Sequence, residues 1–200
     1  MFLPWVLQAQ DTFYLRTNYY GVTGSTLREI RQSLDRSRPH VGSTQHDGMT
    51  VWSIDWNLSV FRRGNTCRLR SFAIRTKAAI TLPFWAMPTN APADLTKAWG
   101  DYSAALGEHE LGHVKFAKAA ATEIRHRVRT IGPRTDCEAL TKEINELAGG
   151  ILQDYRQKEK EYDERTRHGA AQGAILRAGS RNGAKTSTMD GGKEGSVNAR

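Results

Sequence analysis

The sequence predicts an α+β fold in which a small antiparallel sheet packs on long helices. Residues 50–60 and 69–82 alternate between apolar and polar side chains, which is the pattern of half-buried strands. Residues 92–128 and 137–162 instead carry apolar side chains at helical spacing. The first of these two helical segments contains an HExxH motif near its centre.

The 200 residues are enough for one domain with a hydrophobic core, which we place at residues 12–173. Residues 1–11 are predicted to be the remnant of a leader or a disordered terminus, because residues 1–7 are apolar but lack a basic start. Residues 174–200 are predicted to be a disordered basic tail rich in Gly and Ser. No stretch of about 18 apolar residues occurs, so we expect no transmembrane segment.

The formal net charge of +8 raises the question of nucleic-acid binding. From residue 170 onward the chain has five basic and two acidic side chains, so this segment contributes a net charge of +3. The other basic residues are spread along the sequence without an aromatic-interleaved patch. A solvated basic surface is therefore favoured over specific nucleic-acid recognition.

A short strand and a helix are predicted before the long strands. Phe13, Leu15 and Tyr19 fall on one face of an alternating run that Gly21 and Gly24 end. Thr26 and Glu29 then have the spacing of a capping box, and a helix follows up to Pro39. Its helical spacing is shown by Leu27, Ile30, Arg31 and Leu34. His40 and His46 lie beyond it without a partner motif, and we expect them to be polar loop residues.

The two alternating runs predict an antiparallel hairpin with one apolar face for helices. The turn is Arg63-Gly64-Asn65, and the second run ends at Pro83. The apolar positions are Trp52, Ile54, Trp56, Leu58 and Val60 in the first run and Phe72, Ile74, Ala78, Ile80 and Leu82 in the second. Tryptophans in such a face are more often core residues than ligand platforms.

The first long helix opens at Pro92 and runs to about Val128. Gly107 and Gly112 interrupt it, each at a cost of roughly 1 kcal/mol relative to Ala, so we expect close packing against that turn. Gly132-Pro133 ends the segment, and Thr135 with Glu138 predicts a capping box for the next helix. One stripe of that helix contains Cys137, Leu140, Ile144, Leu147, Ile151, Tyr155 and Tyr162.

The chain has two cysteines, Cys67 and Cys137, which are seventy positions apart and form no CxxC pair. That spacing disfavours shared zinc ligation, which leaves two buried thiols or one disulfide. Cys137 lies on the apolar stripe, so its burial and its pairing with Cys67 are both expected. A disulfide would imply an oxidising compartment.

His109-Glu110-Leu111-Gly112-His113 places two imidazoles on one helical face, where both can bind one metal ion. Glu110 then lies beside the ion and can take a proton from its bound water. Chance predicts on the order of 0.01 such matches in a chain with so few histidines. The motif therefore favours a zincin-like fold with HExxH on the central helix over a solvated helix that carries two histidines.

A catalytic zinc needs a third protein ligand and an open position for water. Ala119 stands where the metzincin pattern requires histidine, and His126 lies about 20 Å along the same helix. The downstream candidates are Glu159, Glu161, Asp163 and His168. The two glutamates lie in a charged run typical of a solvated helix face. His168, before a glycine at the helix end, is the first candidate, and Asp163 is the reserve.

Several motifs occur together in this chain. HExxH at 109–113 is followed by YDERTRHG at 162–169. The accompanying positions are Tyr20, Gly24-Ser25-Thr26, Asp47-Gly48-Met49-Thr50-Val51-Trp52, Trp56, Cys67, Leu82-Pro83-Phe84-Trp85, Trp99, Tyr102 and Cys137. In this combination, from Tyr19 to Gly173, the chain resembles a bacterial family catalogued as domain of unknown function 922. Its members are described as secreted zinc-dependent proteases, so the resemblance implies zinc, a periplasmic or secreted location and His168 as third ligand.

These features predict a zinc metallopeptidase in which His109, His113 and His168 hold Zn²⁺ and Glu110 is the general base. Tyr162, or less favourably Arg165, would donate to the developing oxyanion. Asp163 would otherwise orient one of the histidines. The strand ending at Leu82-Pro83 is expected to form the cleft edge along which a peptide substrate pairs.

Two alternatives remain at this point. The first is a non-catalytic binding module of the cell envelope, with a structural or vestigial zinc site, whose basic surface and tail engage an anionic polymer or a partner protein. The second is a nucleic-acid binder, which the expected disulfide disfavours. The composition leaves the substrate, the role of the tail and the oligomeric state open.

Overall fold

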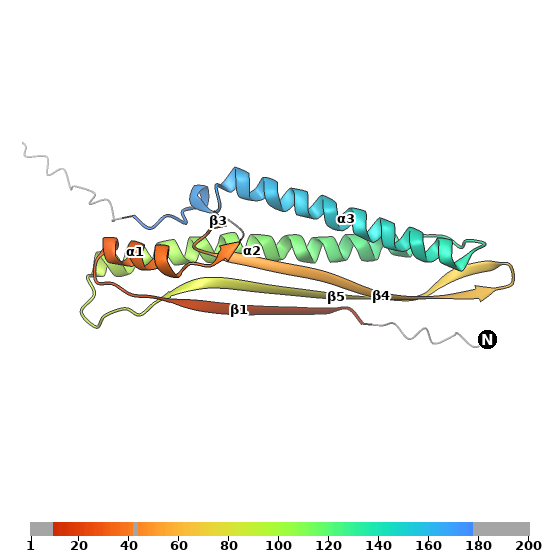
Figure 1. The fold of residues 1–200 in the computed structure, drawn as a ribbon, viewed down its shortest axis with the longest axis horizontal. Helices are drawn as coiled ribbons and strands as arrows, with labels where there is room; N and C mark the ends of the chain where they lie inside the picture. Colours follow the sequence, from red (N-terminus) through yellow and green to blue (C-terminus); the bar gives the residue numbers. More distant parts are fainter. Residues whose placement is uncertain (1–9, 42–43, 178–200) are drawn as a thin grey trace, which may run out of the picture.

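The computed structural model describes residues 10–41 and 44–177. The predicted leader and tail therefore lie mostly outside the described residues. The elements in chain order are β1 (Thr12–Val22), α1 (Leu27–Ser37), β2 (His40–Val41), β3 (Thr44–Gln45), β4 (Met49–Arg63), β5 (Thr66–Trp85), α2 (Ala93–Arg129), α3 (Cys137–Thr166) and the short 3-10 helix η1 (Ala170–Gln172). Figure 1 shows α2 and α3 running along one side of the long strands.

The sheet has the strand order β1-β5-β4. The predicted hairpin of β4 and β5 is confirmed, because the two strands pair antiparallel around the turn at Gly64. The prediction of an antiparallel sheet is wrong for β1, which pairs parallel to β5. The chain passes through α1 before it enters β4, so β5 returns between the two earlier strands and runs in the direction of β1. The sheet is therefore mixed.

The apolar face predicted for β1 is not buried. Phe13, Leu15 and Tyr19 are 39%, 44% and 65% exposed. β1 forms an edge of the sheet, and the long helices pack over β4 and β5 instead. Burial in β1 is concentrated at Val22, which joins Ile30 of α1 in a second core cluster.

The main core fills the space between the hairpin and the long helices. The predicted alternation is confirmed, since Trp52, Ile54, Phe72, Ile74 and Ile80 are all buried there. The facing helical positions of this core include Val114, Ala117, Ile124, Leu140, Ile144 and Ile151. The tryptophan at 52 is thus a core residue, although its indole Nε1 also reaches a glutamate of α3.

The helix starts follow two of the three predictions. The capping box of Thr26 and Glu29 is confirmed, and α2 begins directly after Pro92. For α3 the predicted capping residue Thr135 is wrong, because the Asp136 carboxylate accepts from the backbone N–H of Glu138 and of Ala139. A carboxylate one residue closer to the helix satisfies two free donors at once.

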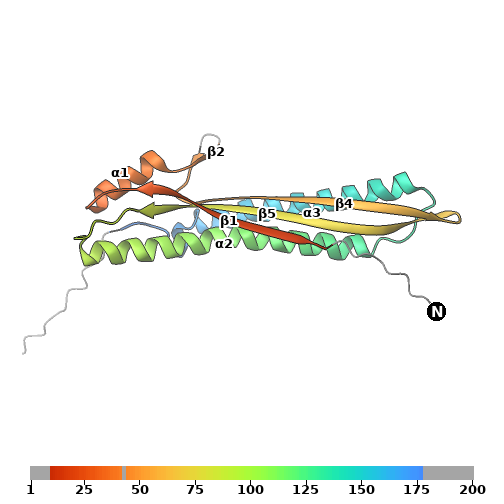
Figure 2. The same cartoon turned by 90° about the horizontal axis from the view of Figure 1, so that it is seen from below.

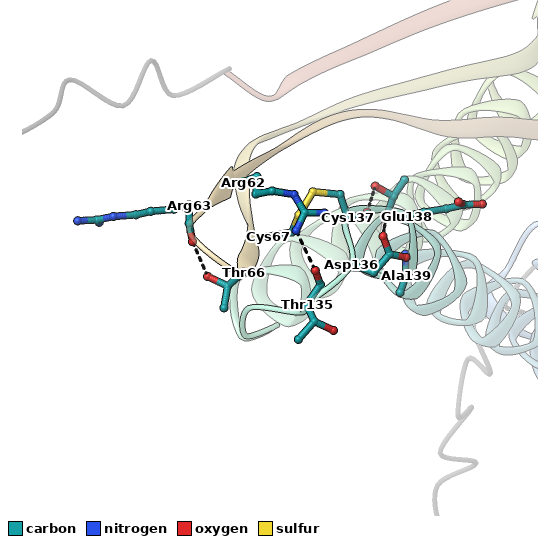
Figure 3. The surroundings of a disulfide bond; sticks show 10 residues. Arg62, Arg63, Thr66, Cys67, Thr135, Asp136, Cys137, Glu138 and Ala139 are labelled. Carbon is teal, nitrogen blue, oxygen red and sulfur yellow. Dashed lines mark hydrogen bonds between the residues drawn. A yellow bond between two sulfur atoms is a disulfide. The ribbon is translucent and has the colours of Figure 1, made fainter.

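A disulfide joins Cys67 at the start of β5 to Cys137 at the start of α3 (Figure 3). The two Cα atoms are 5.1 Å apart, and Cys67 also forms a two-bond bridge with the backbone of Arg134. The bond ties the turn end of the hairpin to the start of α3. Within the described part of the chain, no helix combines the length and the apolarity that spanning a bilayer requires.

Candidate metal centre

The HExxH motif lies in the middle of α2 and faces the sheet and α3. His109, Glu110 and His113 are 2%, 3% and 6% exposed. Helical spacing places the two imidazoles on one side, with their ring centroids 4.9 Å apart. Three titratable side chains are thus buried at one turn of a helix, which is costly unless each has a partner.

The last turns of α3 supply a carboxylate to this pair. Asp163 Oδ1 lies 3.2 Å from His109 Nε2 and 3.1 Å from His113 Nε2, and the two Nε2 atoms are 3.3 Å apart. Four ligands at about 2.0 Å from a tetrahedral zinc would be separated by about 3.3 Å. The three atoms therefore have the mutual spacing of zinc ligands.

The other ring nitrogens fix the orientation of the imidazoles. His109 Nδ1 is 2.9 Å from Gln172 Oε1, and His113 Nδ1 is 2.9 Å from Glu159 Oε1. A nitrogen that faces an acceptor carries the proton, which leaves each Nε2 lone pair directed at Asp163. With both imidazoles neutral, Asp163 Oδ1 is buried and has no hydrogen-bond donor among the described residues. Three acceptors converge on one point, and a cation would satisfy all of them.

The electrostatics of the metal-free site match this geometry. Burial of the His113 imidazole opposes protonation, but hydrogen bonds to Asp163 and Glu159 outweigh it and raise the pKa of His113 to about 9. Burial would raise the pKa of Asp163, yet hydrogen bonds from His109 and His113 hold this pKa below its usual range. The site thus concentrates negative charge and favours any positive occupant, a proton or a metal ion.

Glu110 is held beside the imidazoles by the start of β4. The Thr50 hydroxyl donates to Glu110 Oε2 at 2.7 Å. Gly48 approaches so closely that an added Cβ would overlap the Glu110 carboxylate and lie 3.0 Å from its Cγ. Burial raises the pKa of Glu110, although the Thr50 hydrogen bond opposes that shift. A buried carboxylate with a raised pKa is suited to accept and return a proton.

A second layer fixes the segment that carries Gly48. Both oxygens of the Asp47 carboxylate accept from Arg31, at 2.7 and 2.6 Å, and one also accepts from the Tyr102 hydroxyl at 2.8 Å. The Tyr20 hydroxyl donates to the Asp47 carbonyl. Burial opposes ionisation of Asp47, but the bonds from Arg31 and Tyr102 hold the pKa of Asp47 low. The sequence does not predict this network, because its members are far apart along the chain and meet only in the folded protein.

The site opens into a cleft of about 480 Å³. One wall is the segment 45–51, which includes the first residues of β4, and the others are α2 and the end of α3. The predicted cleft edge at Leu82-Pro83 is wrong, because these two residues pair with Tyr19 and Tyr20 of β1 and are not among the residues that line the cleft. β4 is the outer strand on this side of the sheet, and its residues Met49, Thr50 and Val51 line the cleft.

His168 lies at the mouth of this cleft, outside the group formed by His109, His113 and Asp163. Its Nδ1 atom is 3.6 Å from Asp163 Oδ1, and its side chain is 53% exposed. Arg167 and His168 both adopt the left-handed conformation after the end of α3, with φ of 51° at each. Their turn places the His168 ring 4.3 Å from the ring of His46. The prediction for His46 thus missed its position on the cleft wall.

Tyr162 supports His109 from behind the metal group. Its ring stacks on the His109 imidazole at 5.0 Å, and its hydroxyl lies 3.3 Å from the His109 carbonyl. The close packing predicted at Gly112 is confirmed, because a Cβ there would overlap the Tyr162 hydroxyl and ring. The same prediction is wrong for Gly107, because a Cβ there would meet no atom of another described residue within 4 Å. Arg165 lies over the outer side of Tyr162.

The charged run on α3 contributes to the site through Glu159. This carboxylate accepts from Trp52 Nε1 at 2.8 Å as well as from His113, and Arg156 bonds its second oxygen. Burial opposes its ionisation, but the bonds from His113 and Trp52 keep the pKa of Glu159 low. Glu159 thus orients a histidine, although the charged run around it predicts a solvated helix face. Glu161 bonds Gln157 on the exposed side of the helix.

Of the comparisons with known proteins, the one with family models gave a match. Residues 17–169 match the model of a family described as "Bacterial protein of unknown function (DUF922)". A search of the curated proteins found no significant match. A search of the solved structures found none either.

Proposed function

Because the chain belongs to the DUF922 family and the description of the matched model states no function, we propose its function from the site: a zinc-dependent hydrolase that cleaves peptide bonds. The observation that carries this proposal is the convergence of His109 Nε2, His113 Nε2 and Asp163 Oδ1 beside the Glu110 carboxylate. His109, His113 and Asp163 would hold the metal, and His168 would stand at the mouth of the cleft. This ligand set replaces the one that the resemblance implied.

When bound, zinc would lower the pKa of a coordinated water toward about 7 and polarise the carbonyl of the substrate. Glu110 supplies the base. Thr50 bonds its Oε2 atom, so Oε1 is the oxygen available to take a proton from water and pass it to the leaving amine. Gln172 and Glu159 keep the Nδ1 protons in place, so both imidazoles stay neutral ligands during the reaction.

The edge of β4 supports a peptide as substrate. An extended peptide can pair with an outer strand through backbone hydrogen bonds alone. Met49, Thr50 and Val51 offer such an edge directly beside Glu110. The disulfide between Cys67 and Cys137 further supports a periplasmic or secreted location, where peptide hydrolysis and thiol oxidation are both common.

Glu110→Gln tests the proposal. The amide keeps the size of the side chain but cannot accept the proton, so we expect cleavage of an unstructured protein such as casein to fall by at least about a hundredfold. Zinc measured by atomic absorption should stay at one ion per chain in wild type and variant. The absence of zinc from metal-replete protein would overturn the proposal. Full cleavage by Glu110→Gln would exclude Glu110 as the general base. Absence of cleavage by the zinc-loaded wild type would favour the non-catalytic binding module instead.

A further inference from the structure

Among the residues that the structure describes, no helix covers one face of the sheet. α2 and α3 both lie on the opposite side of the strands (Figure 1), and Figure 2 shows the uncovered side from below. The strand register defines the exposed rows: Tyr14, Lys77 and Ser53 form one row. Arg16, Ala79 and Val51 form the next. We call this surface the open face.

The open face is basic. Arg75 and Arg68 continue it along β5, paired with Asp55 and Phe61 of β4. From Arg68 to Lys77 the strand covers about 30 Å. The basic side chains at 16, 68, 75 and 77 are all exposed, and none forms an ion pair with another residue in the described part of the chain. Asp55 is the acidic side chain on these rows. The surface thus presents four free cations against one carboxylate.

An apolar hollow lies among these cations. It measures about 540 Å³, and Tyr14, Val51 and Ala79 are among the residues that line it. Tyr14 is 59% and Val51 52% exposed, which is high for side chains of this size. Arg16 and Lys77 line the same hollow. An apolar group seated in it would therefore have basic side chains next to it.

The open face and the metal cleft are continuous. Val51 lines both the hollow and the cleft, because it lies on the outer strand β4 at the point where the two surfaces meet. A chain that leaves the hollow over this edge arrives beside Thr50, whose hydroxyl holds Glu110. The two surfaces can therefore contact one extended ligand.

We propose that the open face is a docking surface for an extended acidic polypeptide, whose apolar side chains enter the hollow and whose carboxylates pair with Arg16, Lys77 and Arg75. Charge complementarity and the apolar hollow together select this partner. A single-stranded nucleic acid would stack its bases on several exposed aromatic side chains. Of the two aromatic residues that line the hollow, Tyr14 is exposed and Trp52 is buried in the core. As a recruiting surface for the cleft, the docking site rests on the proposed hydrolase.

Binding to metal-free, full-length protein tests the docking surface. The probe is a short fluorescent peptide of alternating glutamate and valine, measured by anisotropy. Arg16→Glu/Lys77→Glu should weaken its binding by at least about tenfold. The matched control is Arg28→Glu/Lys115→Glu, which changes exposed residues of the same types on α1 and α2 and should alter binding by less than about twofold. Both variants retain the basic side chains after residue 177.

Three outcomes would overturn the inference. Equal weakening by both double variants would show that the peptide senses only net charge. Unchanged binding after serine replaces the valines of the peptide would show that the hollow is not used. Tighter binding of an oligothymidylate of equal length would assign the open face to nucleic acid.

The metal-free condition separates this inference from the proposed function. If the zinc-loaded protein cleaves no peptide but Arg16→Glu/Lys77→Glu selectively loses binding, the hydrolase fails and the docking surface stands. If cleavage occurs and the two double variants bind equally, the hydrolase stands and the docking surface fails.

Discussion

Two candidate ligands, Asp163 and His168, lie in different backbone environments on either side of the end of α3. Asp163 belongs to the helix, and its Oδ1 atom faces both Nε2 atoms of the motif. His168 follows a left-handed turn and is half exposed. We therefore expect Asp163→Ala to weaken zinc binding by at least about a hundredfold and His168→Ala to change it by less than about fivefold. Competition with a chromophoric chelator measures both, and the reverse order would restore His168 as the ligand.

Gly112 and Gly107 form a matched pair of helical glycines on α2. Ala at 112 would overlap Tyr162, which also supports His109, so Gly112→Ala should destabilise the protein by about 1–3 kcal/mol. Gly107 has free space around its Cα, so Gly107→Ala should stabilise the protein by about 0.5–1 kcal/mol. Urea denaturation distinguishes the two signs. Equal effects would mean that Tyr162 does not pack against this turn.

At the scale of elements, the disulfide stabilises the end of the molecule opposite α1. It closes a loop of 70 residues, for which chain entropy predicts about 4 kcal/mol of stabilisation. Cys67→Ser/Cys137→Ser should lower the free energy of unfolding by that order. The disulfide lies near the end of α2, and Val128 at that end is about 22 Å along the helix from His113 of the metal site. Zinc affinity of the folded double variant should thus stay unchanged, and a loss of zinc binding would show that the two ends are coupled.

The sequence predicted each long element but not how the elements combine. Alternation located β4 and β5 because both strands have one face on the core and one in solvent. The same alternation at Phe13, Leu15 and Tyr19 does not indicate burial, because β1 is an edge strand and the long helices pack chiefly over β4 and β5. Strand direction also carries no signal in the side-chain pattern. Only the parallel pairing of β1 with β5 reveals that the sheet is mixed.

At the scale of the molecule, the site is assembled from both halves of the chain. HExxH fixes its own geometry, since spacing on one helix decides which side chains meet. Asp163, Glu159 and Gln172 reach it only because α3 packs along α2 and η1 folds back after the left-handed turn. Those contacts depend on tertiary packing, so the sequence could rank acidic and histidine candidates in this region but not choose between them.

The free energy of unfolding should change with pH in opposite directions for the zinc-loaded and the metal-free protein. In the metal-free protein the pKa of His113 is raised from 6.5 to about 9, chiefly by Asp163 and Glu159 against the effect of burial. A raised folded-state pKa contributes stability that is fully present below pH 6.5 and is lost as the pH rises through about 9. We expect the free energy of unfolding to fall by on the order of 2 kcal/mol over that window.

Zinc must displace this proton from His113, so its binding strengthens as the pH rises. The increase in melting temperature on adding zinc should therefore be larger at pH 9 than at pH 6.5. Thermal unfolding with chelator and with zinc, at both pH values, measures the two trends. His113→Gln removes the titrating group and should abolish the pH dependence of the metal-free protein in this window. A metal-free stability that rises toward pH 9 would contradict the arrangement of His113 between Asp163 and Glu159.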